Sequence, residues 1–126
     1  MTALDVPGIV GRGARLFNRG RYLEAQELWE EAWHAAAVDD RGLLEALVQL
    51  AGGLHLRTRR GGMRGAEHLL SQALVTLEDY RPSAHGLDVE TLVAEFVAYV
   101  DWVRQVRRPH RFTDTLRIPR LVVQEA

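Results

Sequence analysis

The sequence predicts an all-α fold, a single-domain bundle of about five helices with an apolar central helix and an extended C-terminal tail. Apolar side chains recur at intervals of three and four residues in five segments, which is the spacing of one helix face. Glycine or proline separates most of these segments, and none alternates apolar and polar residues as a half-buried strand does. A length of 126 residues is typical of one domain. We therefore expect one helical domain over residues 1–126, with 109–126 as its non-helical tail.

The first two segments predict a helical hairpin. Asp5 and Pro7 are typical of a helix start, but the three glycines that follow weaken the first turns, so we expect only a short helix over 10–17. Gly20 suits the left-handed residue that follows a helix end. A second helix is expected over 21–37, and its apolar face carries Tyr22, Ala25, Trp29, Ala32, Trp33 and Ala36.

The third segment is the most apolar and predicts the central helix. Residues 38–41 are expected to form a loop, in which Asp39 or Asp40 caps a helix over 42–59. The glycine pair Gly52-Gly53 inside this helix costs about 1 kcal/mol per residue relative to alanine. We interpret the pair as a place where a neighbouring helix approaches closely. The apolar stripe of the helix consists of Leu43, Leu47, Leu50, Ala51 and Leu54.

Two more helices and a tail complete the expected fold. A fourth helix is predicted over 63–80, and the proline and glycine of residues 81–86 predict a loop after it. Asp88 is expected to cap a fifth helix that reaches residue 107. The tail has no helical period. Its residues 116–123 indicate an extended strap that docks on its own bundle, docks on a second copy, or is disordered.

Composition and charge weigh against several classes of function. The chain has no cysteine, which excludes disulfides, thiolate metal sites and a cysteine nucleophile. A formal net charge of -1 lacks the basic excess of a generic nucleic-acid or acidic-membrane binder. The N-terminus lacks the pattern of a signal peptide, and no apolar run is long enough to span a membrane. We therefore expect a cytoplasmic protein, with neither a membrane nor a nucleic acid as its partner.

The second predicted helix carries the most informative polar residues. Gln26, Glu27 and Glu30 form a polar edge beside Trp29 and Trp33. Carboxylates on adjacent turns can bind a divalent cation or share a proton, because like charges at close range raise the pKa of one group. The same residues also fit a solvated acidic face with one hydrogen-bonded amide. The sequence alone favours the solvated face and leaves the site open.

The central helix adds His55 and Gln49 as candidates. A lone histidine on an apolar helix is more often packed than a ligand, although His55 could face the acidic edge if the two helices pack antiparallel. The sequence contains no His pair at metal spacing, no HExxH or GxSxG motif and no phosphate loop. Two arginine clusters suit the negative ends of helix dipoles, with phosphate contact as a weaker alternative. They are Arg57, Arg59, Arg60 and Arg64, and Arg104, Arg107, Arg108 and Arg111.

One motif combines a turn, an acidic series and a tryptophan at set spacing: Phe17-Asn18-x-Gly20-x-Tyr22-x-Glu24-Ala25-Gln26-Glu27-x-x-Glu30-x-x-Trp33. It resembles the signature of the uncharacterised prokaryotic family called domain of unknown function 309. Residues 47–51, His55 and 65–70 resemble the rest of the pattern, and the resemblance extends to about residue 92. It implies a small bundle of helices and brings no established activity.

The resemblance also implies a site. The family pattern has His-Glu-x-x-Glu, which would suggest a metal or proton-handling edge, but Gln26 supplies only an amide at the histidine position. Carried over position by position, the polar site is Glu24, Gln26, Glu27, Glu30, Gln49 and His55, with Trp33 as its apolar wall.

Two functional hypotheses follow. The first is a binding or structural module with a polar Gln/Glu/His site beside tryptophans, which recognises a small molecule or a partner helix. The alternative is a hydrolase-like enzyme, metal-dependent or acting by carboxylate acid–base chemistry, in which Glu27 and Glu30 act with His55. Neither hypothesis identifies a metal, a cofactor, a substrate or the oligomeric state, and a homo-oligomer stays open.

Overall fold

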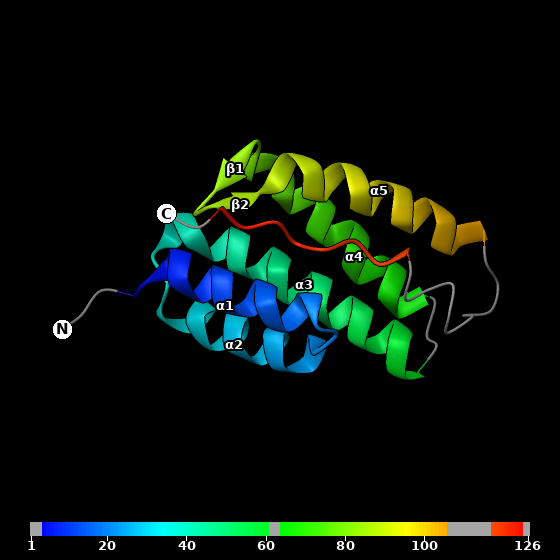
Figure 1. Ribbon diagram of the computed structural model, residues 1–126, viewed down its shortest axis with the longest axis horizontal. Helices are drawn as coiled ribbons and strands as arrows, with labels where there is room; N and C mark the ends of the chain where they lie inside the picture. The colour runs from blue at the N-terminus through cyan, green and yellow to red at the C-terminus, as the bar shows by residue number, and fades with distance from the viewer. Residues whose placement is uncertain (1–3, 61–63, 106–116, 125–126) are drawn as a thin grey trace.

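The computed structural model describes residues 4–60, 64–105 and 117–124 of the chain. In this part of the chain five α-helices form an up-and-down bundle, in which each of the first four packs against the next (Figure 1). Helix α3 therefore lies between α2 and α4, and the prediction of an all-α bundle with an apolar central helix is confirmed. The helices are α1 (Val6–Asn18), α2 (Tyr22–Ala35), α3 (Val38–Arg60), α4 (Arg64–Leu77) and α5 (Val89–Gln105).

The hydrophobic core draws side chains from all five helices. Phe17 lies at its centre, with its ring centroid 6.2 Å from those of both Trp29 and Phe96. The predicted stripe of α3 is buried, and a Cβ added at Gly53 would lie only 3.0 Å from Leu70 on α4. Gly53 thus allows the close approach of α4 that the glycine pair predicted. The fully buried apolar side chains of α3 are Leu43, Leu44, Ala46, Leu47, Leu50, Ala51 and Leu54.

Helix α1 begins earlier than predicted, at Val6 rather than residue 10. Asp5 caps it, since Oδ1 of Asp5 accepts a hydrogen bond from the backbone N–H of Gly8 at 3.1 Å. The prediction counted only the helix-weakening effect of the glycines. Gly13 instead provides the space for the indole of Trp29, because a Cβ there would lie 2.2 Å from the ring. Burying a large aromatic side chain outweighs the propensity cost of one glycine.

The predicted loop at 38–41 is also wrong, because α3 already begins at Val38. Only Ala36 and Ala37 separate it from α2. The two aspartates lie in the first turn of α3, where the positive end of the helix dipole stabilises their carboxylates. Asp40 has a tertiary contact as well, with its Oδ1 2.7 Å from Nε2 of His85.

The connection between α4 and α5 contains structure that the sequence did not predict. After a 3-10 turn (Glu78–Tyr80), strands β1 (Ser83–Ala84) and β2 (Leu87–Asp88) form an antiparallel hairpin. Both residues of its tight turn have positive φ, 48° at His85 and 83° at Gly86, as in the two-residue turns that suit hairpins. A strand of two residues is too short to show alternation. The predicted cap of α5 is confirmed, because Asp88 accepts a hydrogen bond from the N–H of Thr91 at 3.0 Å.

Residues 117–124, which we call the strap, lie across the bundle between α1 and α5 (Figure 1). Leu121 is buried in the core, and Val123 pairs with Leu87 of the hairpin. The strap therefore docks on its own bundle, which was one of the three predicted possibilities. Residues 106–116, which include the predicted end of the fifth helix and the start of the tail, lie outside the described residues.

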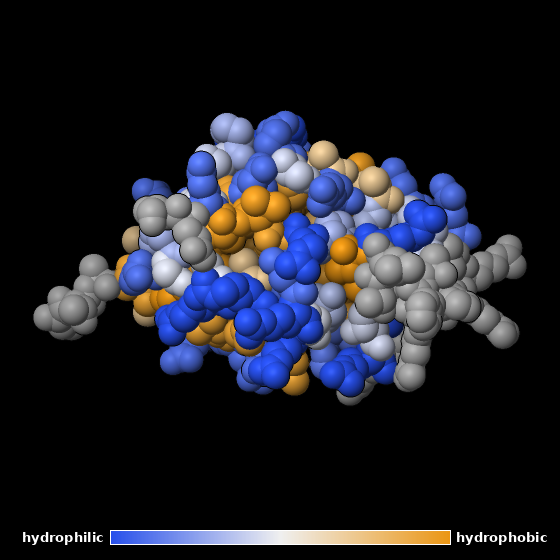
Figure 2. All heavy atoms as spheres, in the orientation of Figure 1, coloured by the Kyte–Doolittle hydropathy of each residue, from blue (hydrophilic) through white to orange (hydrophobic). Residues whose placement is uncertain are grey.

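The surface of the described part is mixed in character. Figure 2 shows hydrophilic side chains in a band over α1 and α2, and apolar surface above that band. Among the described helices, none combines the length and apolar character needed to cross a bilayer.

Candidate functional site

The predicted polar residues of α2 are divided between two sides of the helix. Glu24 and Glu27 line a groove against α1. Gln26 lies about 200° further round the helix than Glu24 and faces α3. The Nε2 atom of Gln26 is 3.2 Å from the position that a Cβ would occupy if one were added to Gly52 on α3. The structure therefore does not gather the predicted residues of this helix on one edge.

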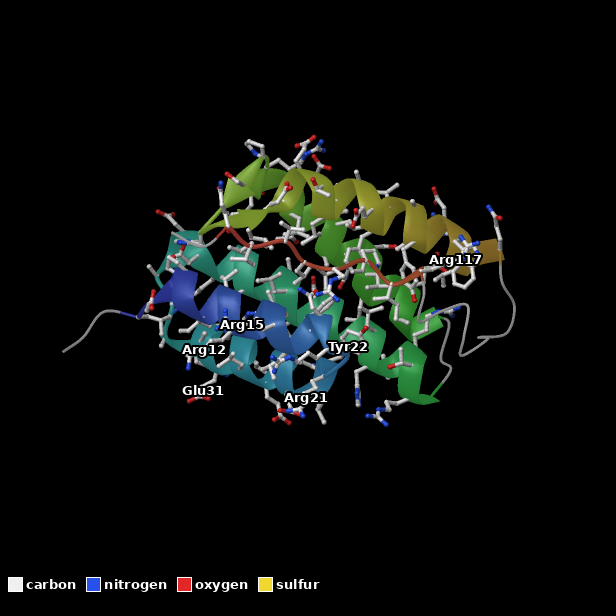
Figure 3. The ribbon with its side chains drawn as sticks, in the orientation of Figure 1. Arg12, Arg15, Arg21, Tyr22, Glu31 and Arg117 are labelled. Atoms are coloured by element: carbon white, nitrogen blue, oxygen red, sulfur yellow. The ribbon has the colours of Figure 1, made fainter. Side chains whose placement is uncertain are left out.

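The groove between α1 and α2 has a volume of about 560 Å³ and carries opposite charges on its two walls. Figure 3 shows Arg12 and Arg15 on α1 and Glu31 on α2. Opposite charges that face each other across an exposed groove stabilise a protein by at most about 1 kcal/mol for each pair. Glu24, Glu27 and Glu31 are exposed carboxylates on a wall opposite the arginines of α1, an arrangement that requires no ligand. Its lining residues are Arg12, Arg15, Leu16, Arg19, Glu24, Glu27, Leu28 and Glu31.

A second hollow, of about 300 Å³, lies where the first turn of α2 meets the last turns of α3. The two helices are antiparallel, as the sequence argument required, but His55 lines this hollow together with Glu24 rather than with Glu27 or Glu30. Figure 3 places Arg21 and Tyr22 at this end of the bundle. We call this feature the α2–α3 hollow. It is lined by Gly20, Arg21, Tyr22, Leu23, Glu24, His55 and Arg59.

The chemistry of the α2–α3 hollow is varied for its size. Burial raises the pKa of Tyr22 to about 12, so its phenol is neutral and can donate a hydrogen bond. Arg21 lies 3.8 Å from Glu24, but both side chains are more than half exposed, so this pair holds neither group firmly. Arg59 adds a second guanidinium and His55 an imidazole. Together they offer two cations, one carboxylate and two neutral or titratable donors.

Sequence reasoning missed three residues of this hollow. Tyr22 was read only as part of the apolar face, although it belongs to the motif. The helix dipole accounts for Arg59 in the sequence analysis, and Arg21 is not among the predicted site residues. The motif's Gly20-x-Tyr22-x-Glu24 spacing was the available signal. It places Arg21 and Tyr22 at the turn that begins α2, whereas Arg59 comes from the end of α3 and lies outside that spacing.

The remaining predicted residues lie elsewhere. Trp33 is half-buried, with the guanidinium of Arg41 5.7 Å from its ring centroid. Glu30 is exposed. Gln49 belongs to the contact between α3 and α4, where its Nε2 donates to Oε1 of Gln72 at 3.4 Å. Trp29 is 0% exposed, so the expectation that it borders a pocket is corrected, and it is a core residue.

The arginine clusters also divide. Arg57 lies near the end of α3 as predicted, but it is only 1% exposed, and its guanidinium lies 5.9 Å from the ring centroid of Trp102. Arg104 pairs with Glu67 and Asp101. The side chains of the other predicted members, apart from Arg59, lie outside what the structure describes.

The described residues contain no group of three or more His, Asp or Glu side chains that could hold a metal ion. The set Glu27, Glu30 and His55, which the alternative hypothesis required, is not brought together there. What the structure does bring together is Glu24 and His55, from two different parts of the sequence pattern.

The fold and the site define an all-α bundle with a small polar hollow between two helices. Residues 10–69 match the model of the family described as Domain of unknown function (DUF309), which confirms the resemblance of the sequence motif to that family. The matched segment covers most of α1, all of α2 and α3, and the first turns of α4, so it includes the α2–α3 hollow. Helix α5 and the strap lie beyond it. No curated protein matches the chain.

Proposed function

We propose that this protein is a binding module that holds a small polar molecule in the α2–α3 hollow. The observation that carries the proposal is the shared lining of this hollow by Glu24 and His55, two positions of the family pattern that lie on different helices. A volume of about 300 Å³ is at the lower end of the range of ligand pockets. The expected ligand is therefore a small metabolite rather than a protein helix.

The charges of the hollow indicate the kind of molecule. Arg21 and Arg59 suit an anionic group, since guanidinium groups bind carboxylate and phosphate oxygens with paired hydrogen bonds. Glu24 accepts hydrogen bonds, and the neutral phenol of Tyr22 donates one. A molecule with one anionic group and one N–H or O–H donor uses all of these side chains. We expect it to be bound in the cytoplasm of a prokaryote.

The positions of the carboxylates favour the binding hypothesis over the hydrolase-like alternative. Glu27 and Glu30 do not join His55 in one cavity of the described structure, so neither can act with it on a common substrate. Glu24 and His55 line the hollow without a second carboxylate, so the pair of glutamates that the hydrolase-like alternative needs is not assembled there. We therefore propose recognition rather than turnover.

The experiment is an NMR titration of the full chain with a set of small carboxylates, phosphates and amino acids. Support would be a compound that shifts the amide resonances of residues 20–24 and 55–59 together. Its affinity should fall about tenfold or more in Glu24→Gln or His55→Gln, because each loses a hydrogen bond to a charged group. The matched control is His68→Gln, since His68 is an exposed histidine on α4. If no compound shifts these amides, or if the control weakens binding equally, the proposal is wrong.

A further inference from the structure

The outward face of the hairpin formed by α1 and α2 carries its charges in two separate stripes. The arginines of α1 recur at intervals of three and four residues and therefore lie along one side of that helix, and the glutamates of α2 do the same. All six side chains are exposed and line the groove between the two helices. We call this surface the hairpin face. Its stripes consist of Arg12, Arg15 and Arg19, and of Glu24, Glu27 and Glu31.

The two stripes match in level along the groove. Because the chain turns back at Gly20, α1 and α2 are antiparallel, so the beginning of one stripe lies beside the end of the other (Figure 1). Figure 3 shows this for Arg12 and Glu31, which lie at the same end of the hairpin. Arg19 and Glu24 flank the turn at the opposite end. Along the whole groove, positive charge on α1 therefore has negative charge on α2 at the same level.

Much of this charge is not neutralised within the described part of the chain. Four members of the stripes make no ion pair with another described residue. The groove thus keeps their guanidinium and carboxylate groups apart, and a second molecule can reach both. These four members are Arg12, Arg19, Glu27 and Glu31.

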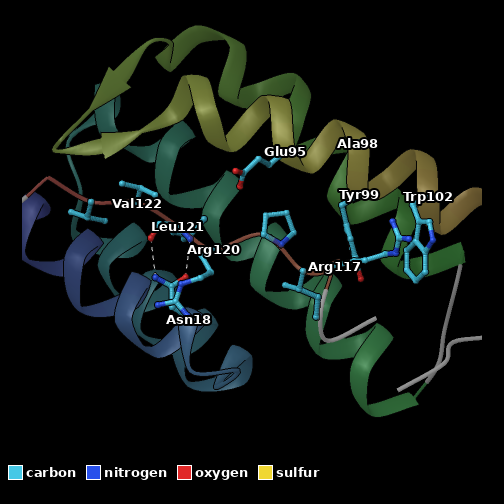
Figure 4. Close-up of a pocket in the computed structure, with 12 residues that line it drawn as sticks. Asn18, Glu95, Ala98, Tyr99, Trp102, Arg117, Arg120, Leu121 and Val122 are labelled. Carbon is cyan, nitrogen blue, oxygen red and sulfur yellow. Dashed lines mark hydrogen bonds between the residues drawn. The ribbon is translucent and has the colours of Figure 1, made fainter. Parts of the chain in front are cut away.

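Contacts away from the groove hold the two stripes in fixed positions. A Cβ added to Gly13 on α1 would lie 2.2 Å from the indole of Trp29 on α2, so the two helices are in close contact. At the end of α1, the side chain of Asn18 exchanges two hydrogen bonds with the backbone of Leu121 in the strap (Figure 4). Since both helices are already held by this packing, a partner need not supply the energy to order them.

We propose that the hairpin face binds a second copy of this chain. A two-fold axis that runs along the groove places α1 of one copy over α2 of the other and leaves every residue at its own level. Arg12 then faces Glu31 of the partner subunit, and Glu31 faces the partner's Arg12. The rest of the stripes pair in the same way, because their levels match within each hairpin. A two-fold axis across the groove would instead bring arginine onto arginine.

The size and chemistry of the hairpin face indicate a weak dimer. Helix α1 has 13 residues, so the face is about 20 Å long, and two helices side by side are about 20 Å wide. Small interfaces of this kind belong to transient complexes, so we expect a dissociation constant between about 10 μM and about 1 mM. The apolar residues that line the groove, Leu16 and Leu28, are already half-buried. Charge rather than apolar area therefore dominates the association.

Analytical ultracentrifugation of the full chain tests the dimer by its response to salt. Raising the salt concentration from about 0.1 M to about 1 M shortens the screening length from about 10 Å to about 3 Å. The dissociation constant should therefore rise at least tenfold. A chain that stays monomeric at millimolar concentration and low salt, or a dimer that salt leaves unchanged, overturns the proposal.

Charge reversal tests the geometry of the dimer. Arg12→Glu places glutamate opposite glutamate at two symmetric positions, and Glu31→Arg places arginine opposite arginine, so each variant alone should dimerise at least tenfold more weakly. An equal mixture of the two variants should recover dimers, because both symmetric contacts are then attractive. Both residues are exposed, so folding is expected to survive, and circular dichroism of each variant checks this. If the mixture does not associate, the proposed arrangement is wrong.

Glu45→Arg and Arg120→Glu form the matched control pair. Both residues are exposed and lie outside the groove, so each variant should dimerise like the wild type, and mixing the two should change the dimer fraction less than twofold. A control pair that behaves like the Arg12 and Glu31 pair would show that net charge drives association, and the proposal would fail. Neither Arg12 nor Glu31 lines the α2–α3 hollow, so the outcome is independent of the proposed function.

Discussion

Two glycines of α1 are expected to respond to alanine substitution with opposite signs. Gly11 and Gly13 are both buried in the same helix, so helix propensity alone predicts a gain of about 1 kcal/mol from either change. The packing separates them. A Cβ at Gly13 would lie 2.2 Å from Nε1 and Cε2 of Trp29, whereas at Gly11 the nearest atom is Nη1 of Arg15 at 3.7 Å.

The magnitudes follow from what can move. The Trp29 indole is fully buried and packs against Phe17, so it cannot yield to a new methyl group without displacing the core. Overpacking of a core costs about 1–3 kcal/mol, and so close a contact belongs at the upper end of that range. After the propensity gain is subtracted, Gly13→Ala should lower the free energy of unfolding by about 2 kcal/mol. Gly11→Ala should raise it by about 0.5–1 kcal/mol.

Urea denaturation of both variants, followed by circular dichroism and tryptophan fluorescence, measures these free energies. A double-mutant cycle adds a control, because the cost of Gly13→Ala should shrink when Trp29 is first replaced by leucine. A shift of both variants in the same direction would refute the reasoning, since propensity rather than the Trp29 contact would then decide the stability of this helix.

Three other perturbations have expected outcomes. Asn18→Ala removes two hydrogen bonds to the backbone of Leu121, which contribute about 1 kcal/mol each. Hydrogen exchange at the Leu121 N–H should therefore accelerate about tenfold or more, while helical N–H groups keep their protection. Unchanged exchange would show that the strap docks without the side-chain amide of Asn18. Asp88→Ala removes the cap of α5. Because the hydrogen bond from Thr91 lowers the pKa of Asp88, the cap stabilises the protein at neutral pH, and this stabilisation is lost as pH falls through the lowered pKa. The free energies of unfolding of variant and wild type should therefore converge in acid, and a difference that stays constant with pH would contradict this. Burial raises the pKa of Tyr22 from 10.0 to about 12, so its stabilisation is complete below pH 10 and declines as pH rises toward 12. Tyr22→Phe should remove a phenol that titrates near 12 from the tyrosinate absorbance curve, and a variant curve unchanged in that region would argue against it.

The helices could be predicted because their apolar spacing is a local property. The inward side chains of α5, such as Phe96 and Val100, repeat at the helical interval and are buried as expected. The start of α1 could not be predicted, because the residue that makes Gly13 favourable is Trp29 on another helix. The hairpin at 83–88 was missed for a different reason. Its strands are held by a turn at His85 and Gly86 and have no periodicity of their own.

The candidate site could be predicted only in part. The helical angle between Glu24 and Gln26 follows from the sequence, but which helix faces each side does not. Whether His55 and Glu24 line the same hollow depends on the register of α2 against α3. That register is set by a connection of two residues, Ala36 and Ala37, where the sequence suggested a longer loop. A connection this short places the end of α3 beside the start of α2.

The two hydrogen bonds between Asn18 and Leu121, which we call the clasp, affect the order in which the chain folds. The helices pack mainly against their neighbours in sequence, which makes most contacts of the bundle local and favours rapid folding. The clasp instead joins residues 103 positions apart. It can form only after residue 121 has been synthesised, when all five helices are already available. A nascent chain can therefore assemble the α2–α3 hollow before the strap docks on the bundle.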